Sequence, residues 1–229
     1  ELCNRNYSMW GITYFALLRL LEKQYLERVV DILKKIEPFN SLLVELIYHI
    51  LVLKEESTSR PFGEEGPLNS FIQMLLNVEL PNIFAALAQF GFYLYREEKF
   101  KSAATLLERL SQQNGLTDFA YQPAILTILA AHSYQKSQND KAATRLYKKG
   151  VKLLKKIEEP EKEFDTNLFL ATAHRELGEM DKSGTFLDKA LALKTNITKT
   201  LREAGLYEEL GKNAYQHKEY DKALDYFTR

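Results

Sequence analysis

The stretch that decides the fold is "GLYEELGKNAYQHKEYDKALDYFTR", residues 205–229. Its apolar residues recur every three or four positions, which is the period of an amphipathic helix and not the alternation of a β-strand. The same period runs through most of the 229-residue chain, and only 10 glycines and 6 prolines interrupt it. The sequence therefore predicts an all-α protein.

Shorter copies of this stretch recur towards the N-terminus. Aligning "KSAATLLERL", "DKAATRLYKKG", "DKSGTFLDKA" and "DKALDYF" brings small residues into one column at spacings of 39, 41 and 40 residues: Ala103, Ala142, Ser183 and Ala223. A large residue followed by Gly or Ala stands upstream of each: Phe90–Gly91, Leu129–Ala130, Leu170–Ala171 and Leu210–Gly211. Small residues on both helices let them approach closely, so each copy predicts a helix hairpin. Such hairpins cannot bury their apolar faces alone and must stack.

These columns resemble the tetratricopeptide repeat (TPR), and the last copy fits its signature best, at Leu210–Gly211, Ala214–Tyr215, Tyr220, Ala223 and Phe227. The period near 40 exceeds the usual length of about 34. It is similar to the longer repeats of polarity adaptors, kinesin light chains and bacterial peptide-sensing regulators. The resemblance implies a right-handed α-solenoid of about five and a half stacked antiparallel helix hairpins. It also implies a non-enzymatic scaffold or adaptor that binds protein or peptide on its concave face.

The chain is expected to divide into two parts. Residues 1–80 carry degenerate helical repeats, interrupted by a polar connector at 54–67. Residues 81–229 carry the TPR-like repeats, with bounds near 81–119, 120–160, 161–200 and 201–229. The last copy stops within its second helix, which predicts that the native protein continues.

The first helix of each hairpin is expected to line the concave wall. Eight residues before each aligned small residue stands a tyrosine or arginine: Tyr95, Tyr134, Arg175 and Tyr215. Their large contact area and hydrogen-bonding groups are typical of binding hot spots. Flanking candidates on the same face are Phe92, Arg96, Gln135, Thr172 and Lys212. The alternative is that the tyrosines pack between hairpins and expose only their hydroxyls.

A second candidate surface is basic. Seven cations and no acidic residue occur from 141 to 156, in a stripe about 120° wide on a helix: Lys141, Arg145, Lys148, Lys149, Lys152, Lys155 and Lys156. The stripe is either a solvated convex surface, balanced by the acidic turn at 158–164, or a docking face for an acidic partner, RNA or a lipid headgroup. Stacking aromatic residues do not accompany the lysines, so nucleic acid is disfavoured as a partner.

The sequence contains no recognisable catalytic, cofactor-binding or metal-binding motif. The four histidines lack metal-ligand spacing, and no nucleophile elbow, P-loop or dinucleotide fingerprint is present. We therefore expect no enzyme activity, no catalytic residue, no cofactor and no metal. The Lys and Asn clamp of chaperone-binding relatives is absent, because residues such as Ala88, Thr127, Leu168 and Glu208 stand at the matching positions.

The expected partner is a protein or peptide, with a multi-subunit complex as one setting. The cations and acids balance at 31 each, and a single cysteine, Cys3, excludes a disulfide framework and favours an intracellular, cytoplasmic location. Apolar runs fall short of the roughly 20 residues of a membrane span. The runner-up functions are binding of an acidic partner or RNA through the basic helix, and the sensor domain of a peptide-responsive regulator.

Overall fold

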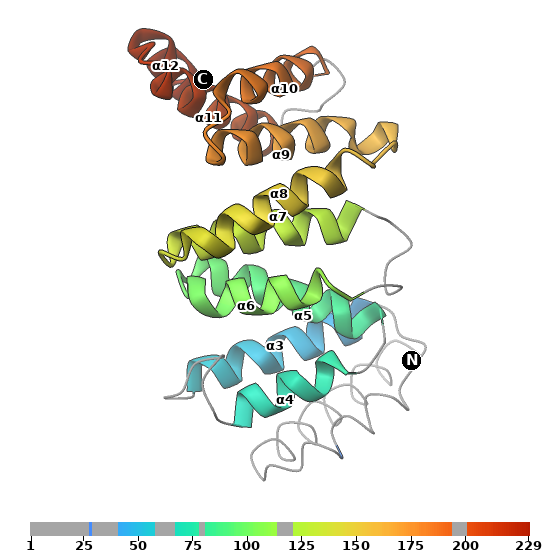
Figure 1. The fold of residues 1–229 in the computed structure, drawn as a ribbon. Coiled ribbons are helices and arrows are strands. Elements are labelled where there is room, and N and C mark those ends of the chain that lie inside the picture. The colour runs from blue at the N-terminus through green and yellow to red at the C-terminus, as the bar shows by residue number, and fades with distance from the viewer. Residues whose placement is uncertain (1–27, 29–40, 58–66, 78–80, 114–120, 194–200) are drawn as a thin grey trace, which may run out of the picture. The chain divides into compact units, whose positions relative to one another are not determined.

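The computed structural model describes residue 28 and residues 41–57, 67–77, 81–113, 121–193 and 201–229. These residues form α-helices, one short 3-10 helix and turns, without a strand among them, so the all-α prediction is confirmed for the described part (Figure 1). The expectations placed on residues 1–27 and 29–40, Cys3 among them, lie outside it. The chain divides into two compact units in the stretch 110–117.

The first unit contains α3 (Ser41–Ser57), α4 (Pro67–Leu76), α5 (Pro81–Arg96) and α6 (Phe100–Leu110). Helix α5 packs against both α3 and α6, so residues on either side of position 80 share one core. Phe71, Phe90 and Leu107 lie in that core with at most 1% of their surface exposed. Helix α3 continues to Ser57, so the first four residues of the predicted connector are helical instead; residues 58–66 lie outside the described part.

The second unit contains three helix hairpins. Their bounds are α7 (Tyr121–Lys136) with α8 (Asp140–Leu154), α9 (Glu163–Glu176) with α10 (Met180–Ala192), and α11 (Leu201–Gln216) with α12 (Tyr220–Phe227). A 3-10 turn, η1 (Pro160–Lys162), precedes α9. Each helix packs against the next along the chain, and α9 also contacts α7 and α11. The hairpins therefore stack in sequence order, the TPR-like architecture that the repeats predict.

The two helices of a hairpin are joined by the same tight turn in four copies. Glu98, Gln138, Gly178 and Lys218 occupy the left-handed region with φ of 57°, 63°, 77° and 62° and stand 40 residues apart. The amide of Gly178 donates to the Arg175 carbonyl at 2.9 Å, and that of Glu179 to the His174 carbonyl at 2.9 Å. This is a Schellman turn, which closes the end of a helix with backbone bonds and gives the chain a sharp reversal.

The turns correct the predicted register by one residue in a single copy. Because Gln138 matches Gly178, the partner of Ser183 in the second unit is Ala143, which is 3% exposed, and not Ala142, which is half-buried. The small-residue column is therefore Ala103, Ala143, Ser183 and Ala223, with a constant period of 40. The two alanines stand side by side, and matching the letters "AAT" in two copies selected the wrong one.

The expected close approach of helices within a hairpin is present. A Cβ at Gly91 would lie 2.6 Å from Cδ2 of Leu107, and one at Gly211 would lie 2.5 Å from Cε1 of Phe227. A side chain at either position would displace its neighbour, because real Cβ contacts are longer. Gly91 and Gly211 thus fix how closely α5 meets α6 and α11 meets α12.

Candidate functional site

The first helices of the three hairpins in the second unit are α7, α9 and α11, and we call them the A helices. They carry most of the predicted binding residues. In the corrected register Gln135, Arg175 and Tyr215 are equivalent, since each stands three residues before the left-handed turn residue. Tyr134 was predicted in that column but matches His174, one position earlier. Tyr95 is the equivalent residue of α5 in the first unit, and Arg96 follows it.

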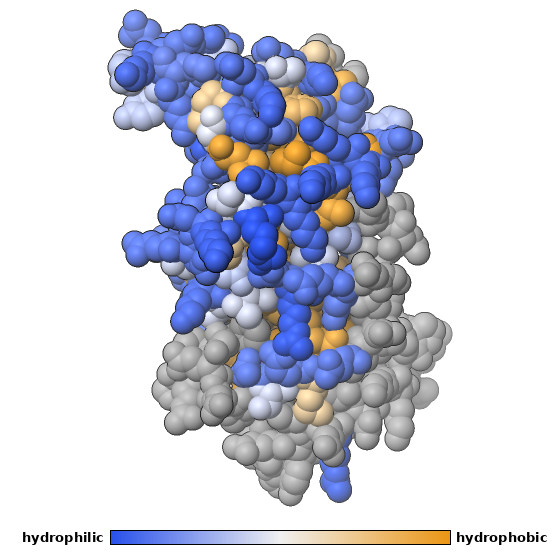
Figure 2. Space-filling view, in the orientation of Figure 1, coloured by the Kyte–Doolittle hydropathy of each residue, from blue (hydrophilic) through white to orange (hydrophobic). Residues whose placement is uncertain are grey.

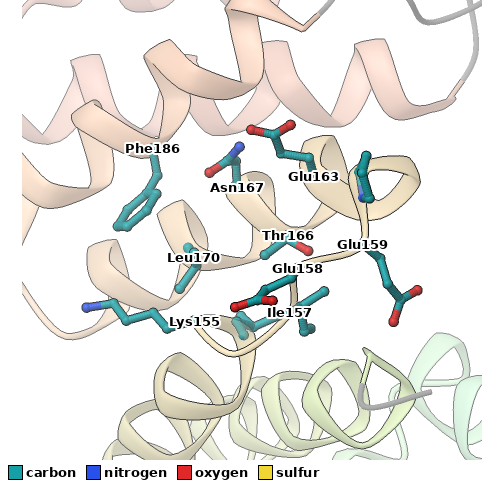
Figure 3. A pocket seen from close by; sticks show the side chains of 11 residues that line it. Lys155, Ile157, Glu158, Glu159, Glu163, Thr166, Asn167, Leu170 and Phe186 are labelled. Carbon is teal, nitrogen blue, oxygen red and sulfur yellow. The ribbon is translucent and has the colours of Figure 1, made fainter. Parts of the chain in front are cut away.

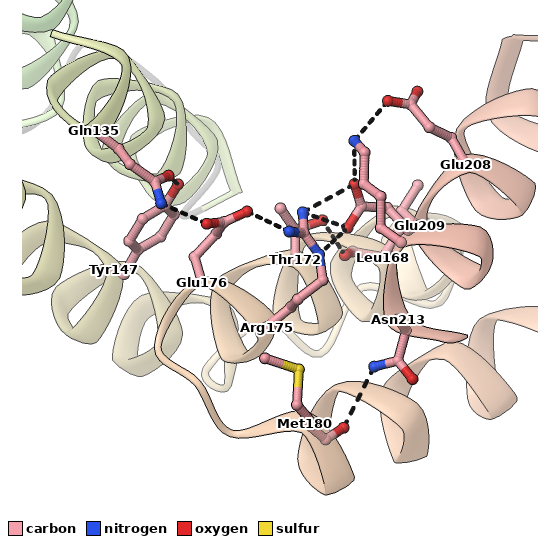
Figure 4. A network of polar contacts seen from close by, with 11 residues as sticks. Gln135, Tyr147, Leu168, Thr172, Arg175, Glu176, Met180, Glu208, Glu209 and Asn213 are labelled. Atoms are coloured by element: carbon pink, nitrogen blue, oxygen red, sulfur yellow. Dashed lines mark hydrogen bonds and ion pairs between the residues drawn. The ribbon is translucent and has the colours of Figure 1, made fainter. Parts of the chain in front are cut away.

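A ladder of polar contacts links the three A helices (Figure 4). Tyr147 Oη donates to Gln135 Oε1 at 2.9 Å, and Gln135 Nε2 donates to Glu176 Oε2 at 2.5 Å. Arg175 pairs with Glu176 at 2.5 Å and reaches across to Glu209 on α11 with three hydrogen bonds of 3.0–3.3 Å. We call Gln135, Tyr147, Arg175, Glu176 and Glu209 the polar ladder.

Arg175 is consequently held inside the protein. It and Glu209 are each only 9% exposed, and the guanidinium uses its fork on carboxylates of its own chain. Buried ions need such pairing, because an unpaired charge away from water is costly. The repeat pattern did not predict Glu176 and Glu209 as members of this site. Opposite charges on matching faces of successive A helices are the signal that could have revealed them.

Lys212 lies at the outer end of the ladder. Its ammonium pairs with Glu209 at 3.0 Å and with Glu208 at 2.5 Å. Burial opposes protonation of the amine, but the two carboxylates outweigh it and raise the pKa of Lys212. The lysine therefore stays charged while 38% of its side chain remains exposed.

The predicted tyrosines differ in exposure. Tyr215 is 60% exposed and meets Tyr220 edge to face at 5.5 Å between ring centroids. Tyr95 is half-buried and packs in the same way on Phe100 at 5.5 Å, so the tyrosine at this position stacks on the first residue of the second helix. Tyr134 is half-buried.

Two further flanking residues, Thr172 and Phe92, differ in how accessible they are to a partner. The Thr172 hydroxyl donates to the Leu168 carbonyl at 3.0 Å, which satisfies it within α9. Phe92 of α5, in contrast, exposes 39% of its surface. Within the second unit, Tyr215 and the exposed part of Lys212 are thus the predicted residues most open to a partner. We call the face of α7, α9 and α11 that carries the ladder the A-helix surface.

The basic stripe lies on α8. Lys148, Lys152 and Lys155 are exposed and Lys149 is half-buried, whereas Leu146, Val151 and Leu154 on the other side are buried. The helix ends at Leu154, two residues before the predicted end, because the amides of Lys156 and Ile157 bond three residues back and tighten the last turn. Among the described residues, Lys148, Lys152 and Lys155 have no ion-pair partner.

Within the described part of the chain, no cluster of three or more His, Cys, Asp or Glu side chains could hold a metal ion. None of the helices in the ranges that the structure describes combines the length and the apolar character needed to cross a bilayer.

Comparisons with known proteins identify similar structures but no family. No family model matches the sequence, and no curated protein matches it. One similar structure is that of nearly identical TPR-like repeats from a Podosopora anserina protein assigned as a kinesin light chain. It is 14% identical, with 96% of this chain and 94% of that chain covered and a TM-score of 0.46. A single-residue variant of that protein is also 14% identical, with 96% of this chain and 92% of that chain covered and a TM-score of 0.49. At this level of similarity neither structure assigns a function.

Proposed function

We propose that the chain is a non-enzymatic scaffold that binds a protein or peptide segment on the A-helix surface. The observation that carries the proposal is the polar ladder, which ties α7, α9 and α11 into one preorganised face. A rigid face loses little conformational freedom when a partner binds, which favours affinity. Tyr215 adds an exposed aromatic ring beside the ladder, the kind of side chain that dominates binding energy at interfaces.

The test uses exposed residues, so that a loss of binding is not a loss of folding. A partner is captured from a lysate by the full chain, identified, and titrated against variants. We expect Tyr215→Ala to weaken the purified complex about tenfold or more. Leu224→Ala on α12, where the leucine is 64% exposed, is the matched control and should leave affinity unchanged. Equal affinities for wild type and Tyr215→Ala would reject the A-helix surface.

A second candidate function rests on the exposed lysines of α8. Three cations without ion-pair partners in the described part of the chain form a surface that an acidic polypeptide could neutralise. Such binding would weaken steeply with salt and with charge reversal at Lys148, Lys152 and Lys155. Retention of an acidic partner at 0.5 M salt by the triple charge-reversed chain would exclude this function.

A further inference from the structure

A cavity of about 420 Å³ opens in the second unit between the end of α8, η1, α9 and α10 (Figure 3). It lies on the opposite side of α9 from the polar ladder. Thr166 in the cavity wall and Arg175 in the ladder stand nine residues apart, which is about two and a half helical turns. The cavity is therefore a site of its own, independent of the A-helix surface.

Part of the cavity wall is apolar. Leu154, Ile157, Leu170 and Phe186 line it from α8, the following turn, α9 and α10. Ile157 and Phe186 are only half-buried, so apolar area remains accessible. Figure 2 shows hydrophobic surface over α9, between the more hydrophilic surfaces of α8 and α10. Walls of this kind suit an apolar side chain of a ligand.

Two polar side chains in the cavity wall lack partners. The hydroxyl of Thr166, a residue 7% exposed, finds no hydrogen bond among the described residues. Several other helical threonines donate four residues back, as Thr127 does to the Pro123 carbonyl at 2.7 Å. Asn167, 6% exposed, likewise has no hydrogen bond within the described part of the chain. A buried polar group without a partner calls for an explanation, and a ligand is one.

The cavity rim is acidic. Glu158, Glu159 and Glu163 line it together with a single cation, Lys155. None of the three carboxylates forms an ion pair within the described residues. A ligand that carries positive charge beside an apolar group would match this rim, and an acidic one would be repelled.

We propose that this cavity binds a short segment of a partner polypeptide in which an apolar side chain is flanked by lysine or arginine. The apolar side chain occupies the space between Leu170 and Phe186. The Asn167 amide has both a donor and an acceptor to offer to the peptide backbone. The flanking cations lie against Glu158 and Glu163, whose charges select basic segments over acidic ones.

The test compares two peptides that share a central leucine and carry flanking residues of opposite charge. Acetyl-Lys-Leu-Lys-amide and acetyl-Glu-Leu-Glu-amide are titrated into the full chain with isotope-labelled methyl groups. We expect the basic peptide alone to shift the methyl signals of Leu154, Ile157 and Leu170. Glu158→Gln combined with Glu163→Gln should weaken its binding about three- to fivefold. Glu161→Gln is the control, because Glu161 is exposed on η1 but does not line the cavity.

Thr166→Val separates a binding role from a structural one. It removes the unpartnered hydroxyl and keeps the shape of the side chain, so we expect a higher melting temperature together with weaker binding of the basic peptide. Equal shifts from both peptides would overturn the proposal, as would an equal loss with Glu161→Gln. Shifts confined to residues of the polar ladder would also overturn it and would instead support the A-helix surface.

Discussion

Ser183 is the member of the small-residue column that carries a hydroxyl, whereas Ala103, Ala143 and Ala223 stand at the equivalent positions. It is 1% exposed, and its Oγ has no partner among the described residues. Burying an unpaired hydroxyl costs free energy, so we expect Ser183→Ala to raise the free energy of unfolding by about 1 kcal/mol.

Ser133 is the matched control for that substitution. It is 0% exposed, but its hydroxyl donates to the Leu129 carbonyl at 2.8 Å. Ser133→Ala should therefore leave stability unchanged or lower it by up to about 1 kcal/mol. Urea unfolding of both variants measures the difference, and a loss of stability in Ser183→Ala would show that its hydroxyl has found a partner, such as a buried water.

His132 on α7 gives the fold a pH dependence. Burial, helped by the charges of Lys136, Lys212 and Arg175, outweighs the attraction of Glu176 and lowers the pKa of His132 below its ordinary value of 6.5. The folded state then prefers the neutral ring. This contribution to stability is fully present above pH 6.5 and is lost as the pH falls towards the lowered pKa.

Urea midpoints should therefore fall between about pH 7.5 and pH 5.5 in the wild type and fall less in His132→Gln. Hydrogen bonds from Lys182 and His174 lower the pKa of Glu179. Its effect on stability therefore falls near and below pH 4.5, outside that pH range. A flat wild-type profile would contradict the expectation. Direct NMR titration of the imidazole gives an independent reading.

At the scale of elements, the polar ladder determines how α9 meets α11. Removing Arg175 leaves Glu176 without a cation and Glu209 with Lys212 alone, so we expect Arg175→Met to cost about 3 kcal/mol of unfolding free energy. The double variant Arg175→Met, Glu209→Met should recover part of that loss, because one of the two carboxylates that pair with Arg175 is then also removed.

An exposed pair provides the comparison for the ladder. Lys222 and Glu219 meet at 3.1 Å with 58% and 51% of their side chains exposed. Lys222→Met should cost less than about 1 kcal/mol, since water screens such pairs. Chemical denaturation of the wild type and the three variants measures these costs. Similar costs for Arg175→Met and Lys222→Met would mean that the ladder contributes contacts but little stability.

The helix pairs could be predicted from the sequence because the period of the apolar residues and the spacing of the small residues both lie within a single hairpin. The register of the second copy could not, since Ala142 and Ala143 fit the column equally well as letters. The partner of Arg175 could not either, because Glu209 stands 34 residues away and only the stacking of α9 on α11 brings them together. The cavity at Thr166 depends on three helices and the turn before α9, and no local pattern marks it.

At the scale of the whole molecule, charge is balanced overall and uneven locally. The sequence has 31 cations and 31 anions and a pI near 7.2, yet the cations of α8 form one exposed stripe. A protein with no net charge lacks the repulsion that keeps copies apart, and opposite patches attract. We expect solubility to be lowest near pH 7 and to rise with added salt, which screens that attraction.

Charge reversal distinguishes the effect of zero net charge from the attraction exerted by the α8 stripe. Lys148→Glu with Lys152→Glu changes the net charge by four units and removes the centre of the stripe, so the solubility minimum should move to lower pH. Replacing two acids of another surface, Asp221→Lys with Asp225→Lys on α12, shifts the net charge by the same amount in the opposite direction but leaves the stripe intact. Light scattering from pH 5.5 to 8.5 at low and high salt distinguishes the two. If both variants gained solubility equally at pH 7 and low salt, net charge alone would account for it, whereas a larger gain for the lysine variant would identify the α8 stripe as the attractive patch.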